Sequence, residues 1–249
     1  MNKKVLERFT VQSYESDFFC RLKPFFLQNH MQELAYKGSE FCGASYDQLR
    51  EDDFFWALNR IHISVSEWPE WREELYLQSW SRAKQGPLWH RNFKMFREGE
   101  EDSPLMLGTS AWTMLNIADR SICRGTHGFN EDFHLEEDTL PFCSKIIVPK
   151  DIKMQDAGNH IVSFSELDTN GHANNCFYTQ WAIDTLPFDY ISTHILSDLR
   201  ICYYHELQFG DNVQLQLGND TKGKWYLQGM LGDTTCFLVE MQFIPTPQQ

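Results

Sequence analysis

The sequence lacks long apolar runs, and it lacks an excess of basic residues. No stretch of its 249 residues approaches the roughly 20 apolar residues that a membrane-spanning helix needs. Residues 1–19 carry charges throughout and have no apolar core of signal-peptide length. Lys and Arg number 22 against 35 Asp and Glu, which gives a net charge of -13. Because affinity for nucleic acid rests on neutralising phosphates, this balance argues against nucleic acid and against an anionic membrane surface.

The cysteines also lack a pattern. There are seven of them, an odd number, and none forms a C-x-x-C pair. Such scattered thiols indicate a reducing compartment rather than a disulfide framework or a zinc site. We therefore expect a cytoplasmic protein with no bound metal. We also expect no organic cofactor.

What is present is apolar and aromatic material for a large core. Hydrophobic residues make up 42% of the chain and aromatic residues 14%, which argues against disorder. Alternating and helical patterns predict the same kind of series twice, a strand, a helix and then several strands. In the first half we expect a helix over 22–38 and strands over 9–19, 56–65, 74–81, 90–97 and 105–116. In the second half we expect a helix from 176 to 187 and strands over 145–148, 160–164, 198–207, 212–217, 224–230 and 235–244.

Between the two series lies a charged, glycine-containing and weakly periodic stretch. We predict three parts: a first repeat over 1–118, a linker over 119–142, and a second repeat over 143–249. The two repeats show little sequence identity, but their spacing agrees. Glu74-Leu-Tyr-Leu77 after a proline turn mirrors Asn212-Val-Gln-Leu215 after a glycine turn.

The stretch 165–187 combines a polar loop with a helix. Asp168, Asn170 and Gly171 favour tight turns, and His172 follows them. The helix after them is mostly apolar, so we expect it to be buried. A helix N-terminus offers free N–H groups and favours negative charge, which suits a reaction that develops an anion. Taken alone, such a loop is more often a helix cap beside a solvated histidine than a catalytic site. A calcium loop is excluded, because Thr179 stands where a bidentate Glu is required.

Four segments resemble one family. Asp168-x-Asn170-x-His172-x-Asn174-Asn175, before a Trp-bearing helix, resembles the active-site segment of acyl-acyl-carrier-protein (acyl-ACP) thioesterases. Three more matches follow the family's order: Trp56 to Ile63 with Trp68-Pro-Glu-Trp71, Gly108-Thr-Ser-Ala-Trp-Thr-Met-Leu-Asn116, and Tyr203-Tyr-His-Glu206. The resemblance implies an α+β double hotdog fold, in which each of two tandem repeats curls an antiparallel sheet around a helix. It also implies an acyl pocket on the side of the first repeat.

The resemblance implies a catalytic set of Asp168, Asn170, His172 and Glu206, all in the second repeat. Asp168 suits a nucleophile or general base, and Asn170 suits orienting a water molecule or donating to an oxygen. His172 can move protons near neutral pH, and Glu206 supplies a second carboxylate. The sequence does not decide which group attacks the carbonyl. We place the oxyanion site at the backbone N–H groups of 171–174.

One departure from the family bears on the nucleophile. In plant members a cysteine follows the second acidic residue, whereas this chain has Leu207 there. Leucine can do no chemistry, so we expect the carboxylates and His172 to carry the reaction. Cys176 and Cys202 are expected to be packing groups.

Three functions stay open at this point. The first is hydrolysis of fatty acyl-ACP, which releases free fatty acid and holo-ACP and ends or diverts fatty acid synthesis. The second is hydrolysis of acyl-CoA by the same chemistry, and the third is an acyl-binding hotdog module without activity. The expected partner is an acyl carrier protein with a phosphopantetheine-linked acyl chain, and a homodimer is left open. Basic residues near the linker are candidates for docking that acidic carrier: Arg120, Arg124, Lys145, Lys150 and Lys153.

Overall fold

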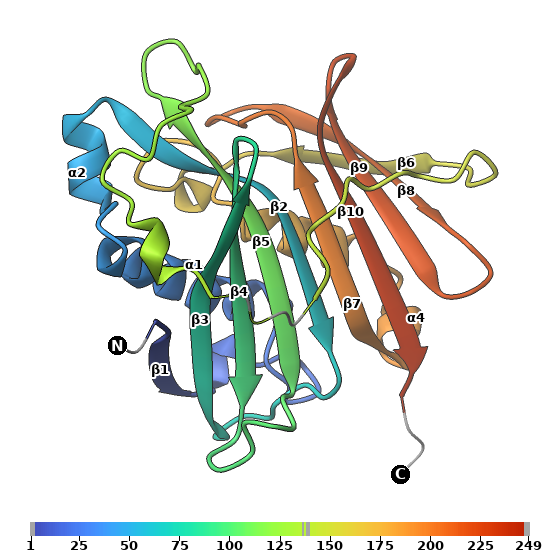
Figure 1. Cartoon of the computed structure of the whole chain (residues 1–249). Helices are drawn as coiled ribbons and strands as arrows, with labels where there is room; N and C mark the ends of the chain where they lie inside the picture. The colour runs from blue at the N-terminus through green and yellow to red at the C-terminus, as the bar shows by residue number, and fades with distance from the viewer. Residues whose placement is uncertain (1–2, 136, 138–139, 247–249) are drawn as a thin grey trace. The chain divides into compact units, whose positions relative to one another are not determined.

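The computed structural model describes residues 3–135, 137 and 140–246, and the chain divides into two compact units (Figure 1). The units are Met1–Cys143 and Ser144–Gln249. The segment predicted as a linker, 119–142, falls within the first unit, apart from residues 136, 138 and 139, which lie outside the described part.

The first unit is one antiparallel sheet with the long helix α1 (Pro24–Phe41) packed against two of its strands, β1 and β3. The strands run in the order β1-β3-β4-β5-β2. They are β1 (Val5–Thr10), β2 (Phe54–Val65), β3 (Glu74–Gln85), β4 (Leu88–Phe96) and β5 (Met106–Asn116). The shorter helices are η1 (Ser13–Glu15), α2 (Tyr46–Glu51) and η2 (Glu131–Phe133).

The second unit repeats this plan. Its strands are antiparallel and run in the order β6-β8-β9-β10-β7. This is the strand order of the first unit, with β6 in the place of β1 and β7 in the place of β2. They are β6 (Gln155–Ile161), β7 (His194–Tyr203), β8 (Asn212–Asn219), β9 (Lys224–Leu231) and β10 (Thr234–Pro245). The helices are η3 (Phe164–Glu166), α3 (Phe177–Asp184) and α4 (Phe188–Ile191). Each unit therefore has the hotdog layout.

Helix α1 begins and ends later than predicted. Pro24 occupies its first turn, where a missing N–H costs nothing. Leu27, Met31 and Leu34 recur at helical spacing, and all three are buried. The helix does not end at Gly38. A Cβ there would lie 2.1 Å from Nη1 of the buried Arg91, so this glycine allows a guanidinium to approach the helix rather than ending it.

Strand ends were the least accurate predictions. The strand predicted over 9–19 ends at Thr10, because the chain turns at Gln12, whose N–H donates to the Glu15 carboxylate. The stretch 160–164 is strand only as far as Ile161, and η3 follows it. The strand predicted over 145–148 is absent from this described segment. Its pattern reflects Ile146, which is buried against Cys202 and Tyr226 without joining a ladder.

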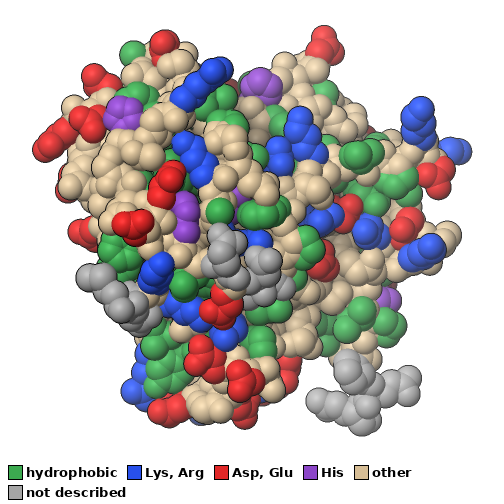
Figure 2. All heavy atoms as spheres, viewed as in Figure 1, with side chains coloured by type: hydrophobic (Ala, Val, Ile, Leu, Met, Phe, Trp, Pro, Cys, Tyr) green, Lys and Arg blue, Asp and Glu red, His purple; other side chains and the backbone are tan. Residues whose placement is uncertain are grey.

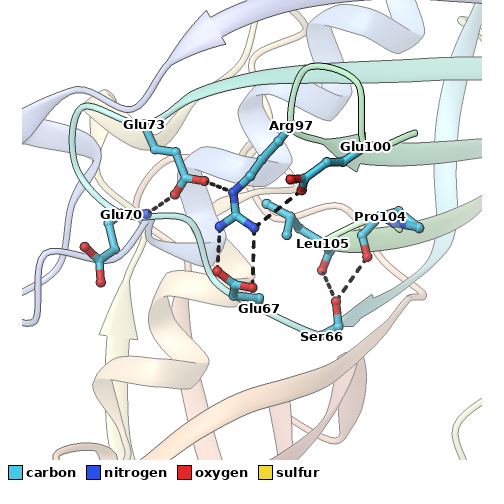
Figure 3. A network of polar contacts seen from close by, with 8 residues as sticks. All are labelled: Ser66, Glu67, Glu70, Glu73, Arg97, Glu100, Pro104 and Leu105. Carbon is cyan, nitrogen blue, oxygen red and sulfur yellow. Dashed lines mark hydrogen bonds and ion pairs between the residues drawn. The ribbon is translucent and has the colours of Figure 1, made fainter. Parts of the chain in front are cut away.

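An arginine holds the turn between β2 and β3 (Figure 3). Arg97 donates from Nε to Glu73 and from Nη2 to Glu67, each at 2.5 Å, and its Nη1 lies 3.9 Å from Glu100. The Arg97 hydrogen bond lowers the pKa of Glu67. These ion pairs are partly exposed, so each adds little to the free energy of unfolding. We expect them mainly to fix the position of the turn relative to Arg97.

The surface mixes charges of both signs. On the face in Figure 2, acidic and basic side chains are interspersed. Among the described residues, no helix is both long enough and apolar enough to cross a bilayer.

Candidate active site

The loop between η3 and α3 is a tight turn that Asp168 organises. The backbone N–H of Asp168 donates to the carbonyl oxygen of His172 at 2.7 Å, and the carbonyl oxygen of Asp168 accepts from the N–H of Gly171 at 3.0 Å. Oδ1 of Asp168 accepts from the backbone N–H groups of Asn170 at 2.8 Å and His172 at 3.2 Å. Oδ2 accepts from Nδ2 of Asn170 at 3.4 Å. Three predicted site residues are therefore linked through one carboxylate.

The fourth predicted residue, Glu206, reaches the loop through His172. Nε2 of His172 lies 3.4 Å from Oε2 of Glu206, and the two side chains are 14% and 37% exposed. A β-bridge joins His172 to Gln208, and Ala173 N–H donates to Leu207 O at 2.8 Å. These backbone contacts place Glu206 at the loop, although it lies 34 positions beyond His172.

Glu206 is not on a strand as predicted. Strand β7 ends at Tyr203, because the next two N–H groups, of Tyr204 and His205, both donate to Cys236 O. Two donors on one carbonyl break the ladder, and the chain leaves the sheet. Glu206 is therefore an exposed loop residue after the end of β7.

Helix α3 is short and buried. As expected for this mostly apolar segment, Tyr178, Trp181 and Ala182 are buried, as is Leu186 just beyond the helix. At the N-terminal end of α3, the side-chain oxygen Oδ1 of Asn174 accepts a hydrogen bond from the backbone N–H of Cys176 at 2.9 Å.

The predicted oxyanion donors are already used, and this prediction is wrong. The N–H groups of residues 171 to 174 each donate to a protein oxygen. The acceptors are, in order, Asp168 O, Asp168 Oδ1, Leu207 O and Glu166 O. The next N–H, of Asn175, meets no hydrogen-bond acceptor among the residues that the structure describes. It precedes α3, where the helix dipole favours an anion.

Tyr178 was expected only to form part of the buried helix. It is 3% exposed and lies in the first turn of α3. Burial first, and then the nearby Cys236, Asp168 and Glu206, raise the pKa of its phenol. Tyr178 is therefore a neutral hydroxyl at the start of α3. Its position three residues after the polar motif was the available signal.

The cysteines form no disulfide, and all seven lie in the described part of the chain. Cys176 and Cys202 are buried, as is Leu207. Within the described part of the chain, His, Cys, Asp and Glu side chains form no group of three that could hold a metal ion.

Comparison with known proteins places the chain. Residues 2–133 match the model of the acyl-ACP thioesterase N-terminal domain, and residues 150–233 match that of the C-terminal domain. Two structures share the fold across almost the whole chain. An acyl-ACP thioesterase from Bacteroides thetaiotaomicron has a TM-score of 0.85 at 22% identity, covering 97% of this chain and 98% of its own. The 12:0-ACP thioesterase from Umbellularia californica has a TM-score of 0.86 at 18% identity, covering 99% of both.

Curated relatives agree at low identity. Oleoyl-acyl carrier protein thioesterase 2 of Arabidopsis thaliana, a chloroplastic protein, is 24% identical over 253 residues, covering 92% of this chain and 67% of its own length. The chloroplastic oleoyl enzyme of Coriandrum sativum is 23% identical over 229 residues, covering 83% and 60%. This chain thus spans about two thirds or less of their length. The predicted double hotdog fold is confirmed. The chain belongs to the acyl-ACP thioesterase family.

Proposed function

We propose that this chain hydrolyses the thioester of fatty acyl-ACP, releasing free fatty acid and holo-ACP and so ending or diverting fatty acid synthesis. The observation that carries the proposal is the contact between His172 and Glu206 at the Asp168 loop, in a chain whose two halves match the two family domains. The plant relatives are named as oleoyl- and dodecanoyl-ACP enzymes, and we propose the same class of substrate, a fatty acyl-ACP, for this chain.

Hydrolysis adds water across the C–S bond. The water oxygen attacks the carbonyl carbon, the C–S bond breaks, and the proton from water ends on the departing thiol. In our mechanism His172, paired with Glu206, takes that proton and returns it to the thiolate. The Asp168 carboxylate already accepts from three donors, so we assign it to orienting Asn170, whose amide holds the water. The Asn175 N–H is our donor to the oxyanion.

For the acyl chain we propose the cavity of the first unit. It holds about 430 Å³ of empty space, part of which is open to solvent. Its apolar lining is Trp56, Trp89, Trp112, Phe129 and the α1 residues Ala35 and Tyr36. His90 in the lining is neutral at pH 7, because burial first, then Arg82 and Arg60, lower its pKa to about 4.

The carrier, the assembly and the compartment are parts of the same proposal. The five basic residues near 119–153 are all exposed, which docking of an acidic carrier requires. A homodimer remains a prediction, which sedimentation would measure. The seven cysteines, which form no disulfide, fit the cytoplasmic, reducing compartment that we predict.

Turnover of one acyl panel on two carriers tests the proposal. Purified protein is given acyl chains of increasing length, each linked to ACP and to coenzyme A, after exhaustive chelation. We expect free fatty acid and carrier thiol in equal amounts, with higher kcat/KM on ACP. A rate confined to coenzyme A esters would favour the acyl-CoA alternative, and binding without turnover would favour the non-catalytic module. A rate that is lost on chelation and restored by zinc would also contradict the proposal.

A further inference from the structure

A second acidic side chain of the loop region, Glu166, lies buried beneath the residues that carry the chemistry. It is 8% exposed and ends η3, two positions before Asp168. We infer that Glu166 is a positioning residue for hydrolysis, fixing the Asp168 loop and helix α3 relative to each other. The inference rests on the proposed function.

The Glu166 carboxylate accepts from three directions. Oε2 accepts from the backbone N–H of Ser163 at 2.7 Å, and Oε1 accepts from the indole Nε1 of Trp181 at 2.9 Å. Nε2 of His160, on β6, lies 3.0 Å from the carboxylate. One side chain thereby joins β6, η3 and the second turn of α3.

The Glu166 backbone closes the other side of the loop. Its carbonyl accepts from Asn174 N–H at 2.8 Å, so the residue before the Asp168 turn is bonded to the residue after it. Because Asn174 also starts α3 through Cys176, the loop and the helix share one support. A substitution of Glu166 should therefore shift Asn170 and His172 relative to Asn175 while leaving the identity of these three residues unchanged.

The environment favours a charged Glu166. Burial raises the pKa of its carboxyl, but the Ser163 N–H, His160 and the Trp181 N–H outweigh it, and the net pKa is lowered. The aromatic ring of Trp181 packs on His160 at 4.3 Å and on Tyr178 at 4.9 Å between centroids. A glutamine has one acceptor oxygen in place of two. In Glu166→Gln its amide group therefore meets a donor, at Ser163 or at Trp181.

The first unit supplies a matched control in Glu15. This residue is 5% exposed, accepts from Gln12 N–H at 2.8 Å, and faces Nε2 of His30 at 3.1 Å. Its carbonyl accepts from Lys23 N–H at 2.8 Å. Glu15→Gln thus damages the same local structure in a loop without Asn170 or His172.

The experiment compares Glu166→Gln with Glu15→Gln in the full chain. For Glu166→Gln we expect kcat on acyl-ACP to fall about 10-fold or more with KM within about threefold, because misplaced groups slow chemistry more than binding. Amide exchange at Asn170 and His172 should accelerate. For Glu15→Gln we expect kcat to stay within about threefold of wild type and exchange at Asn170 and His172 to be unchanged. Trp181→Phe, which removes one donor and keeps a ring, serves if Glu166→Gln does not fold, with a smaller loss of the same kind.

Equal kcat losses in the Glu166 and Glu15 variants would overturn the inference and leave only a stability role. So would wild-type exchange and kcat in folded Glu166→Gln. A wild-type protein that does not hydrolyse acyl-ACP would instead contradict the proposed function, and amide exchange would still decide whether Glu166 fixes the loop.

Discussion

The two units contain the same loop, and we assign hydrolysis to only one of them. In the first unit Oδ1 of Asp17 accepts from Phe19 N–H at 2.8 Å and Arg21 N–H at 2.9 Å. In the second unit Oδ1 of Asp168 accepts from the corresponding residues 170 and 172 at 2.8 and 3.2 Å. The turns close alike, with a 2.7 Å bond from each Asp N–H to the carbonyl four residues on.

The agreement extends to the chain that packs beside each loop. Leu22 N–H donates to Pro69 O at 2.8 Å, as Ala173 N–H does to Leu207 O. By this register Trp68 stands in the place of Glu206. The duplicated backbone therefore holds Phe, Arg and Trp in one copy and Asn170, His172 and Glu206 in the other. The comparison teaches that the Asp carboxylate shapes the loop in both copies, so we assign the chemistry to the side chains that the second loop presents.

The largest expected effects fall on the groups that only the second loop has. His172→Ala and Glu206→Gln should each lower kcat on acyl-ACP by on the order of 10²-fold or more, the scale of losing a general acid–base group. Arg21→Ala and Trp68→Phe, at the matching positions, should leave kcat within about threefold. Full activity in Glu206→Gln would return that residue to an ordinary surface carboxylate.

A much smaller effect is expected from the thiol nearest the site. Cys176→Ala should keep kcat within several-fold of wild type, with losses that follow packing, since Cys176 is 2% exposed and precedes α3. Steady-state rates corrected for the folded fraction would measure this. An inactive but correctly folded Cys176→Ala protein would show that a thiol takes part, against the mechanism proposed here.

The smallest expected effect concerns the backbone conformation that the two loops share. Gly171 has φ of +80°, and Cys20 occupies the matching position at +62°. A Cβ at Gly171 meets nothing within 4 Å, so Gly171→Ala should cost only the left-handed strain of about 1 kcal/mol, or about 2–4 °C in Tm. Cys20→Gly removes that strain but adds unfolded-chain entropy, so its Tm should change by less than about 2 °C. Thermal unfolding of both variants tests these values, and a loss above about 8 °C for Gly171→Ala would contradict them.

Sequence patterns predicted the local features well. Asp168, Asn170 and His172 are close in sequence, so a tight turn was sufficient to bring them together. The Ser45–Gln48 capping box at the start of α2 is likewise a local feature, because it depends on residues three apart.

Features set by distant contacts were harder to predict. Glu206 entered through the family resemblance, and its loop depends on Cys236 O, which no local pattern reveals. The oxyanion donors were misplaced, because Leu207 O and Glu166 O take up N–H groups that look free in a linear motif. Glu166 itself was missed, since a glutamate before a polar loop usually faces solvent.

The paired substitution of the two loop aspartates tests the central claim most directly. Asp168→Asn keeps an oxygen for the two backbone donors but turns an NH2 toward Nδ2 of Asn170, whereas Asp17→Asn makes the same change beside Arg21. The measurement is kcat on one acyl-ACP for wild type and both variants at equal folded fraction. We predict a loss on the order of 10²-fold for Asp168→Asn, the scale of misplacing a reacting group, and a change within about threefold for Asp17→Asn. Similar losses in both variants, or none in either, would contradict the claim that the second loop carries the hydrolysis.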